Sequence, residues 1–295
     1  MPIPPPDAYA GFERLKLGWY LDWRTNPNPS RPGGIEYAQM VWVNGRQISP
    51  DIPTIQAIAR QNPGSLWLIG NEPDVIWQGK ATPEEYAEAY YTAYHAIKQA
   101  DPTAQVAIGG VSQPTPLRIR YIEAILQVYR ERYGEEMPVD VWNIHNFILR
   151  EERNSWGVDI PPGLPDDTGI LYEVDDSGNL EAFKAQIWAF RRWMKEKGFQ
   201  DKPLIVSEYG IPMPWDYGFP FERVRNFMYA TFDFFLTAAD PELGYPPDGY
   251  RLVQRWCWYS LGDLTYPTGN LFDPDTKEMT PLGKAFVAYM ERLGD

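Results

Sequence analysis

The sequence predicts an α/β fold, a single (β/α)8 TIM barrel over residues 1–295 in which one strand is short or irregular. Apolar runs of strand length alternate with amphipathic helical patterns from end to end, as parallel strands joined by crossover helices require. The first run is followed by "DWRTNPNPSRPGG", which lacks the G-x-G-x-x-G spacing of a dinucleotide-binding sheet. A barrel is therefore favoured over a doubly wound sheet.

Seven apolar runs are predicted to be strands. They cover residues 15–23, 36–43, 65–71, 104–110, 139–147, 202–210 and 254–261. Seven is one fewer than a closed eight-stranded barrel needs. Either a short irregular strand lies between Asn44 and Gln61, or the barrel is reduced.

Five helices are predicted between these strands. The best marked covers 82–101, where Thr82 is the expected N-cap, Pro83 occupies the first helical position and Glu85 completes a capping box. The other four patterns cover 117–133, 180–197, 221–239 and 281–293.

The composition argues against nucleic acid and membranes as partners. The net charge of −13 argues against nucleic acid, whose phosphates an acidic surface repels. No apolar stretch has the length of a membrane span, and "MPIPPPDAYAGF" does not read as a signal peptide. We expect a monomer without a membrane partner; localisation stays open, because a longer secreted form is possible. The single cysteine excludes an intrachain disulfide.

Two carboxylates close apolar strands, Glu72 in "SLWLIGNEPD" and Glu208 in "KPLIVSEYG". In a barrel, the chemistry lies where strands end, so these two side chains can face one pocket. The chain has only two His, one Cys and no G-x-S-x-G motif, so parts are missing for zinc, thiol and serine-triad chemistry. Paired carboxylates are the catalysts of glycosidases, and no cofactor or metal is expected.

The same stretches resemble clan A glycoside hydrolases. "IGNEPD" is similar to the Asn-Glu-Pro motif of that clan, and "PLIVSEYG" is similar to its nucleophile strand. The likeness extends over 82–110 and over the tail "GNLFDPDTKEMTPLGKAF". More loosely, the brief N-terminal half and early "NEPD" resemble the compact glycosyl hydrolase catalytic core group, which includes endo-β-1,3-glucanases. In the clan the acid/base closes the fourth strand, whereas Glu72 closes the third strand predicted here.

The resemblance implies roles for individual residues. Glu72 is expected to be the acid/base, Glu208 the nucleophile, and Asn71 a hydrogen-bond partner of the sugar 2-hydroxyl. The remaining matches, all expected to bind substrate, are His145, Trp258 and, less specifically, Tyr209.

Aromatic content predicts further substrate contacts. Aromatic residues make up 15% of the chain, with 12 Trp and 19 Tyr, and flat rings suit the C–H faces of pyranose sugars. Trp77 and Trp215 lie just beyond the two Glu motifs and are expected to form subsites. Trp23 and Arg24 end the first strand and are also candidates, although Arg24 could equally form a structural pair with Asp22. A stretch as long as 147–179 is expected to be either a functional cover or a disordered segment.

Taken together, the sequence predicts a retaining glycoside hydrolase that cleaves β-linked neutral glycans. Endo-action on β-glucan is expected, with β-1,3 linkages favoured, and the partner is an oligo- or polysaccharide. Two alternatives stay open: a carbohydrate-binding barrel without turnover, and a transglycosylase that uses the same two Glu.

Overall fold

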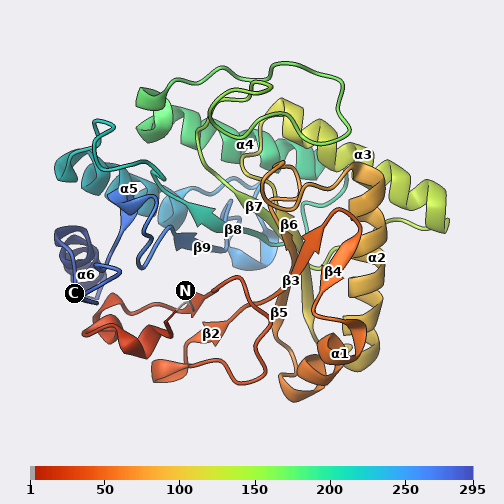
Figure 1. Ribbon diagram of the computed structural model, residues 1–295, viewed down its shortest axis with the longest axis horizontal. Coiled ribbons are helices and arrows are strands. Elements are labelled where there is room, and N and C mark those ends of the chain that lie inside the picture. The colour runs from red at the N-terminus through yellow and green to blue at the C-terminus, as the bar shows by residue number, and fades with distance from the viewer. Residues whose placement is uncertain (1–3, 295) are drawn as a thin grey trace.

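The computed structural model describes residues 4–294 and places helices around the outside of a set of short strands (Figure 1). The strands are β1 (Trp19–Tyr20), β2 (Glu36–Tyr37), β3 (Gln39–Asn44), β4 (Gln47–Ser49), β5 (Leu66–Asn71), β6 (Gln105–Gly110), β7 (Trp142–His145), β8 (Leu204–Tyr209) and β9 (Arg255–Trp258). The α-helices are α1 (Ile52–Gln61), α2 (Pro83–Ala100), α3 (Pro116–Tyr133), α4 (Leu180–Glu196), α5 (Phe221–Thr237) and α6 (Pro281–Leu293). Short 3-10 helices are η1 (Pro6–Ala8), η2 (Phe12–Leu15), η3 (Pro32–Gly34), η4 (Val174–Gly178), η5 (Pro246–Asp248) and η6 (Pro267–Gly269).

The strands form three small sheets, and the predicted closed (β/α)8 barrel was wrong. The sheets have the orders β1-β2, β4-β3-β5-β6 and β7-β8-β9. Isolated parallel bridges connect β6 to the β7 region, but across the described residues no backbone hydrogen bond joins β9 to β1. That seam is crossed by side chains instead: Trp19 Nε1 donates to the Trp256 carbonyl over 3.2 Å, and Arg255 pairs with Glu36.

The region between Asn44 and Gln61 does not supply the eighth parallel strand that a closed barrel needs. It does contain a short strand, β4, but the chain reverses at Gly45 (φ +58°), so β4 runs antiparallel to β3. Helix α1 follows, capped by the Asp51 side chain, which accepts from Thr54 N over 3.1 Å. Helix α1 was not predicted from the sequence.

Strand β5 buries both of its faces. In β5, Trp67 and Ile69 belong to the large core cluster shared with the helices, while Leu66 and Leu68 belong to a smaller cluster. Because successive side chains point to opposite faces of a strand, this alternation places β5 between two apolar layers. The smaller cluster draws from all three sheets: Trp19, Ala38, Met40, Leu66, Leu68, Ala107, Val141 and Ile205.

The five predicted helices are present, with ends within two residues of their expected positions. The capping box of α2 is formed as expected: Thr82 Oγ1 accepts from Glu85 N, and Glu85 Oε2 accepts from Thr82 N. In α3, Thr115 caps the start and Gly134 (φ +73°) ends the helix. Between residues 4 and 294, no helix has the length and apolar character needed to cross a membrane.

Candidate active site

Glu72 and Glu208 lie on either side of His145. The Nδ1 atom of His145 is 2.9 Å from Glu72 Oε1, and its Nε2 atom is 3.5 Å from Glu208 Oε1. Trp23 Nε1 donates a further hydrogen bond to Glu208 Oε1 over 2.5 Å. One imidazole thus bridges two carboxylates that come from the ends of different strands, which is the juxtaposition expected from the sequence.

The turn after β5 fixes the position of Glu72. Its N–H donates to the Gly110 carbonyl, and its own carbonyl accepts from Val75 N and Gly79 N. The backbone of Glu72 has φ +41°, a left-handed conformation that a non-glycine residue holds only when its surroundings enforce it. The turn therefore directs the carboxylate toward His145 rather than along the strand.

An irregularity in β8 fixes the position of Glu208. The register with β9 shifts between Val206 and Tyr209, and the register with β7 shifts at His145. Such a shift changes which side chains point to which face. As a result Glu208 points toward His145, whereas Tyr209 points toward the helices.

Burial and charge set the protonation of these groups. Burial, reinforced by the nearby Glu72 carboxylate, raises the pKa of Glu208 to about 7, although His145 and the Trp23 hydrogen bond act in the opposite direction. Burial alone would lower the pKa of His145, but Glu208 and Glu72 outweigh it and raise that pKa above its usual value. Since both ring nitrogens face carboxylates, the doubly protonated ring suits this position.

Asn71 carries an unsatisfied polar atom beside this cluster. Its side chain is buried, and its Oδ1 atom has no hydrogen-bond partner within the described structure. A buried polar atom without a partner is uncommon, and a ligand hydroxyl is one group that could satisfy it.

Trp23 and Arg24 lie at the end of β1, in different environments. The Trp23 ring reaches Glu208 and packs edge-on against Tyr259, with ring centroids 6.0 Å apart. Arg24 forms an ion pair with Asp22, whose carboxylate also accepts from the Tyr37 hydroxyl. The structural pair considered as the alternative for Arg24 is thus formed.

Tyr209 and Trp258 are adjacent, but only Trp258 borders the cavity described below. Tyr209 is completely buried, and its hydroxyl lies 3.4 Å from Thr231 Oγ1 on α5. Its ring packs perpendicular to that of Trp258, with centroids 5.4 Å apart. Tyr209, which the resemblance grouped with the substrate-binding residues, thus packs in the core between β8 and α5.

Exposed aromatic rings occur on β3 and on the segments that follow Glu72 and Glu208. Trp77, after Glu72, is 55% exposed, and Trp215, after Glu208, is 80% exposed. Trp42 on β3 is also exposed, and its Nε1 atom donates to the Trp23 carbonyl over 2.5 Å. Trp42 and Tyr259 were not among the site residues predicted from the sequence, although each lies near the end of a predicted strand.

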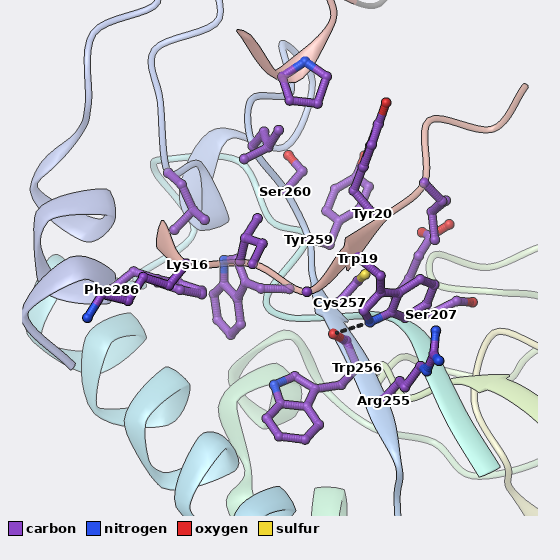
Figure 2. A pocket seen from close by; sticks show the side chains of 18 of the residues that line it. Lys16, Trp19, Tyr20, Ser207, Arg255, Trp256, Cys257, Tyr259, Ser260 and Phe286 are labelled. Carbon is purple, nitrogen blue, oxygen red and sulfur yellow. Dashed lines mark hydrogen bonds between the residues drawn. The ribbon is translucent and has the colours of Figure 1, made fainter. Parts of the chain in front are cut away.

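A cavity of about 520 Å³ runs along the seam between β1 and β9 (Figure 2). At the active-site end its walls include Asp22, Trp23, Glu208 and Tyr259, and at the far end it reaches α6. Figure 2 shows Trp19 and Trp256 on its wall, joined by their hydrogen bond. In the part of the chain that is described, no three His, Cys, Asp or Glu residues lie together in a way that could hold a metal ion.

Comparison with known families gives a match to the N-terminal half. Residues 6–155, just over half of the chain, match the model of the family described as glycosyl hydrolase catalytic core. This segment contains Glu72 and His145. A search of curated proteins found no match.

Solved structures share the fold over nearly the whole chain. A GH128 subgroup II endo-β-1,3-glucanase from Pseudomonas viridiflava is 15% identical, with a TM-score of 0.63, and the match covers 93% of this chain and 90% of that one. A subgroup I endo-β-1,3-glucanase from Amycolatopsis mediterranei, in complex with laminaripentaose, is 15% identical (TM-score 0.61; 98% and 97% covered). A curdlan-specific exo-β-1,3-glucanase of subgroup III from Blastomyces gilchristii is 18% identical (TM-score 0.59; 96% and 99% covered).

Proposed function

The chain belongs to the glycosyl hydrolase catalytic core family and is a glycosidase, and we propose that it hydrolyses β-1,3-glucan with retention of anomeric configuration. The observation that carries this proposal is the pair Glu72 and Glu208, bridged by His145 at the ends of β5 and β8. The β-1,3-glucanases that share the fold support the choice of linkage.

In the proposed mechanism, Glu208 attacks the anomeric carbon while the bond to the leaving oxygen breaks and Glu72 gives that oxygen its proton. The product of this step is a covalent glycosyl ester of Glu208. Water then attacks the same carbon, Glu72 takes a proton from the water, and Glu208 leaves as a carboxylate. Two displacements on one carbon restore the original configuration.

Neighbouring residues are proposed to hold the sugar in the reacting position. The unsatisfied Oδ1 atom of Asn71 would accept a hydrogen bond from the 2-hydroxyl. Trp258 would supply an apolar surface beneath the sugar, and Trp23 and His145 would stabilise the Glu208 carboxylate. Arg24, paired with Asp22, would shape the edge of the site.

Endo-action is the proposed mode of cleavage, because exposed rings occur on β3 and on the segments that follow Glu72 and Glu208. Trp42, Trp77 and Trp215 could each stack on a sugar beyond the one that reacts. An enzyme of this kind should release a ladder of laminari-oligosaccharides. A product series restricted to glucose would assign exo-action instead.

A substrate panel tests the proposed function. Laminarin, mixed-linkage glucan, cellulose, mannan and xylan should be incubated with the protein, and the products identified; we expect cleavage of laminarin. Proton NMR of the first products should show the β-anomer, whereas the α-anomer would indicate inversion. Binding without turnover would favour a carbohydrate-binding protein, and dominant transfer to an acceptor sugar would favour a transglycosylase.

The pH dependence should follow the charge on Glu208. Because its pKa is about 7, kcat/KM should fall as the pH drops below 7 and the attacking carboxylate becomes protonated. His145 lowers this pKa, so His145→Asn should move the acid limb of the kcat/KM profile to higher pH. The chain offers a matched control in His95, on α2, which is about half exposed and close to Glu135. His95→Asn should leave the profile unchanged, and an identical acid limb in H145N would contradict the assignment.

A further inference from the structure

Arg118 on α3 is completely buried and makes contacts with three separate connections. Its Nε atom lies 2.7 Å from both Asp74 Oδ2 and Ser112 Oγ. Its Nη1 atom donates to Glu151. Its Nη2 atom donates to the carbonyls of Val158 (3.0 Å) and Asp159 (3.1 Å). One guanidinium therefore ties together the β5–α2 turn, the β6–α3 turn and the long β7–α4 segment.

Asp74 connects this guanidinium to Glu72. It lies two residues after Glu72, within the turn closed by the Val75 N to Glu72 carbonyl hydrogen bond. Its buried carboxylate also accepts from the N–H and the hydroxyl of Ser112. A residue with φ +41° persists only where its surroundings hold it, and the anchoring of Asp74 supplies such a hold on the turn.

Glu151 connects the same guanidinium to the long 147–179 segment. Its buried carboxylate accepts from Thr115 Oγ1 and from Ile170 N, the latter over 2.7 Å. Gly169 packs so closely that a Cβ atom there would lie 2.3 Å from Glu151 Oε2. The outgoing and returning halves of the 147–179 segment are thus joined at Glu151.

We propose that Arg118 is a positioning residue for the glycosidase reaction: through Asp74 it holds the turn that carries Glu72, and through Glu151 it holds the 147–179 segment. This inference rests on the proposed function. A planar guanidinium with five donors can satisfy both carboxylates and two carbonyls at once, which a lysine ammonium cannot. The turn that carries Glu72 and the 147–179 segment are therefore set in place by the same group.

The contact of Arg118 with Asp74 and its contact with Glu151 predict different kinetic effects. Asp74→Asn removes the charge that pairs with Arg118 and should lower kcat about 10- to 100-fold with little change in KM, because small displacements of a catalytic group are costly. Glu151→Gln should chiefly raise KM, since it loosens the 147–179 segment, whose first residue, Phe147, packs edge-on against the ring of His145. Arg118→Met should show both effects, and Arg118→Lys should recover part of the lost kcat.

Arg191 provides the matched control. It is also completely buried in a helix, α4, but its partners are the carbonyls of Leu252 and Lys202 and the side chain of Gln254. Arg191→Met should lower the melting temperature while the folded protein keeps its kcat and KM. Equal losses of kcat in R191M and R118M, at equal melting temperature, would overturn the positioning role.

Kinetics on laminarin distinguish a failure of the positioning role from a failure of the proposed function. Wild-type turnover together with an unchanged kcat in folded D74N overturns the positioning role of Arg118 alone. A wild type without turnover on any glycan overturns the proposed function, and the positioning role falls with it.

Limited proteolysis gives an independent readout. R118M should be cut within 147–179 faster than wild type and R191M. Equal rates of cleavage would overturn the role of Arg118 in holding this segment.

Discussion

Replacing Glu208 with glutamine should lower kcat on laminarin by at least about 10⁴-fold, because a carboxamide cannot form the glycosyl ester. The side chains have nearly the same shape, so glucan binding should persist. Initial rates by reducing-sugar release and binding by calorimetry would establish both. Glu222→Gln, on the first turn of α5, alters a glutamate outside the site and should leave turnover unchanged. Turnover by E208Q within tenfold of wild type would exclude Glu208 as the nucleophile.

Although Glu208→Gln should nearly abolish turnover, the same substitution should stabilise the folded protein at alkaline pH. A carboxyl group whose pKa rises from 4.5 to about 7 on folding binds its proton more tightly in the native state, so its ionisation destabilises that state as the pH rises through this range. The full penalty, on the order of 3 kcal/mol, is present above pH 7. Chemical denaturation of E208Q and wild type should therefore show a difference in unfolding free energy that favours E208Q more at pH 8 than at pH 5. A difference that does not change with pH would contradict the buried, raised-pKa state of Glu208.

Replacing Glu72 with alanine should slow laminarin hydrolysis about 10³-fold, within the range by which a general acid accelerates proton transfer. The first step should become sensitive to the leaving group. An aryl β-laminaribioside made with an acidic phenol releases its phenolate without protonation. E72A should therefore form the glycosyl ester from this substrate at a rate close to that of wild type. Hydrolysis of the ester should stay slow, because no base activates the water.

Added azide distinguishes this role from a structural one. The azide ion needs no general base, so it should accelerate turnover of the aryl substrate by E72A and give a β-glycosyl azide, identified by NMR. Glu84→Ala, in the first turn of α2, is a suitable control because that residue lies outside the site. If E72A loses the same factor on laminarin and on the aryl substrate, and azide has no effect, Glu72 is not the acid/base.

Much of the fold could be predicted because it depends on local chemistry. Strands such as β5 are buried on both faces and so appear as continuous apolar runs. Helix α2 carries its start signal in Thr82 and Glu85. Closure of the barrel depends instead on whether the first and last strands exchange backbone hydrogen bonds, which is a long-range property. Helix α1, with ten residues, gave too short a pattern between its flanking turns to be recognised.

The candidate site likewise has features that follow from local sequence and features that do not. Glu72 and Glu208 could be predicted because a carboxylate at the end of an apolar strand is costly unless it is used. Tyr209 was expected to bind substrate because it directly follows Glu208 in the stretch that resembles the nucleophile strand. The register shift after Val206 places Glu208 toward His145 and Tyr209 toward the helices. No residue in "LIVSEYG" announces that shift.

The seam between β1 and β9 has a consequence for the dynamics of the molecule. Parting β5 from β6 breaks a ladder that runs from Leu66 to Asn71, whereas parting β1 from β9 breaks side-chain contacts alone. We therefore expect the amides of Trp19 and Tyr20 to exchange with deuterium sooner than those of β5. Because Glu208 lines the cavity along this seam, we expect each such opening to admit solvent beside its carboxylate. The hydration of Glu208, the proposed nucleophile, would then depend on how often the seam opens.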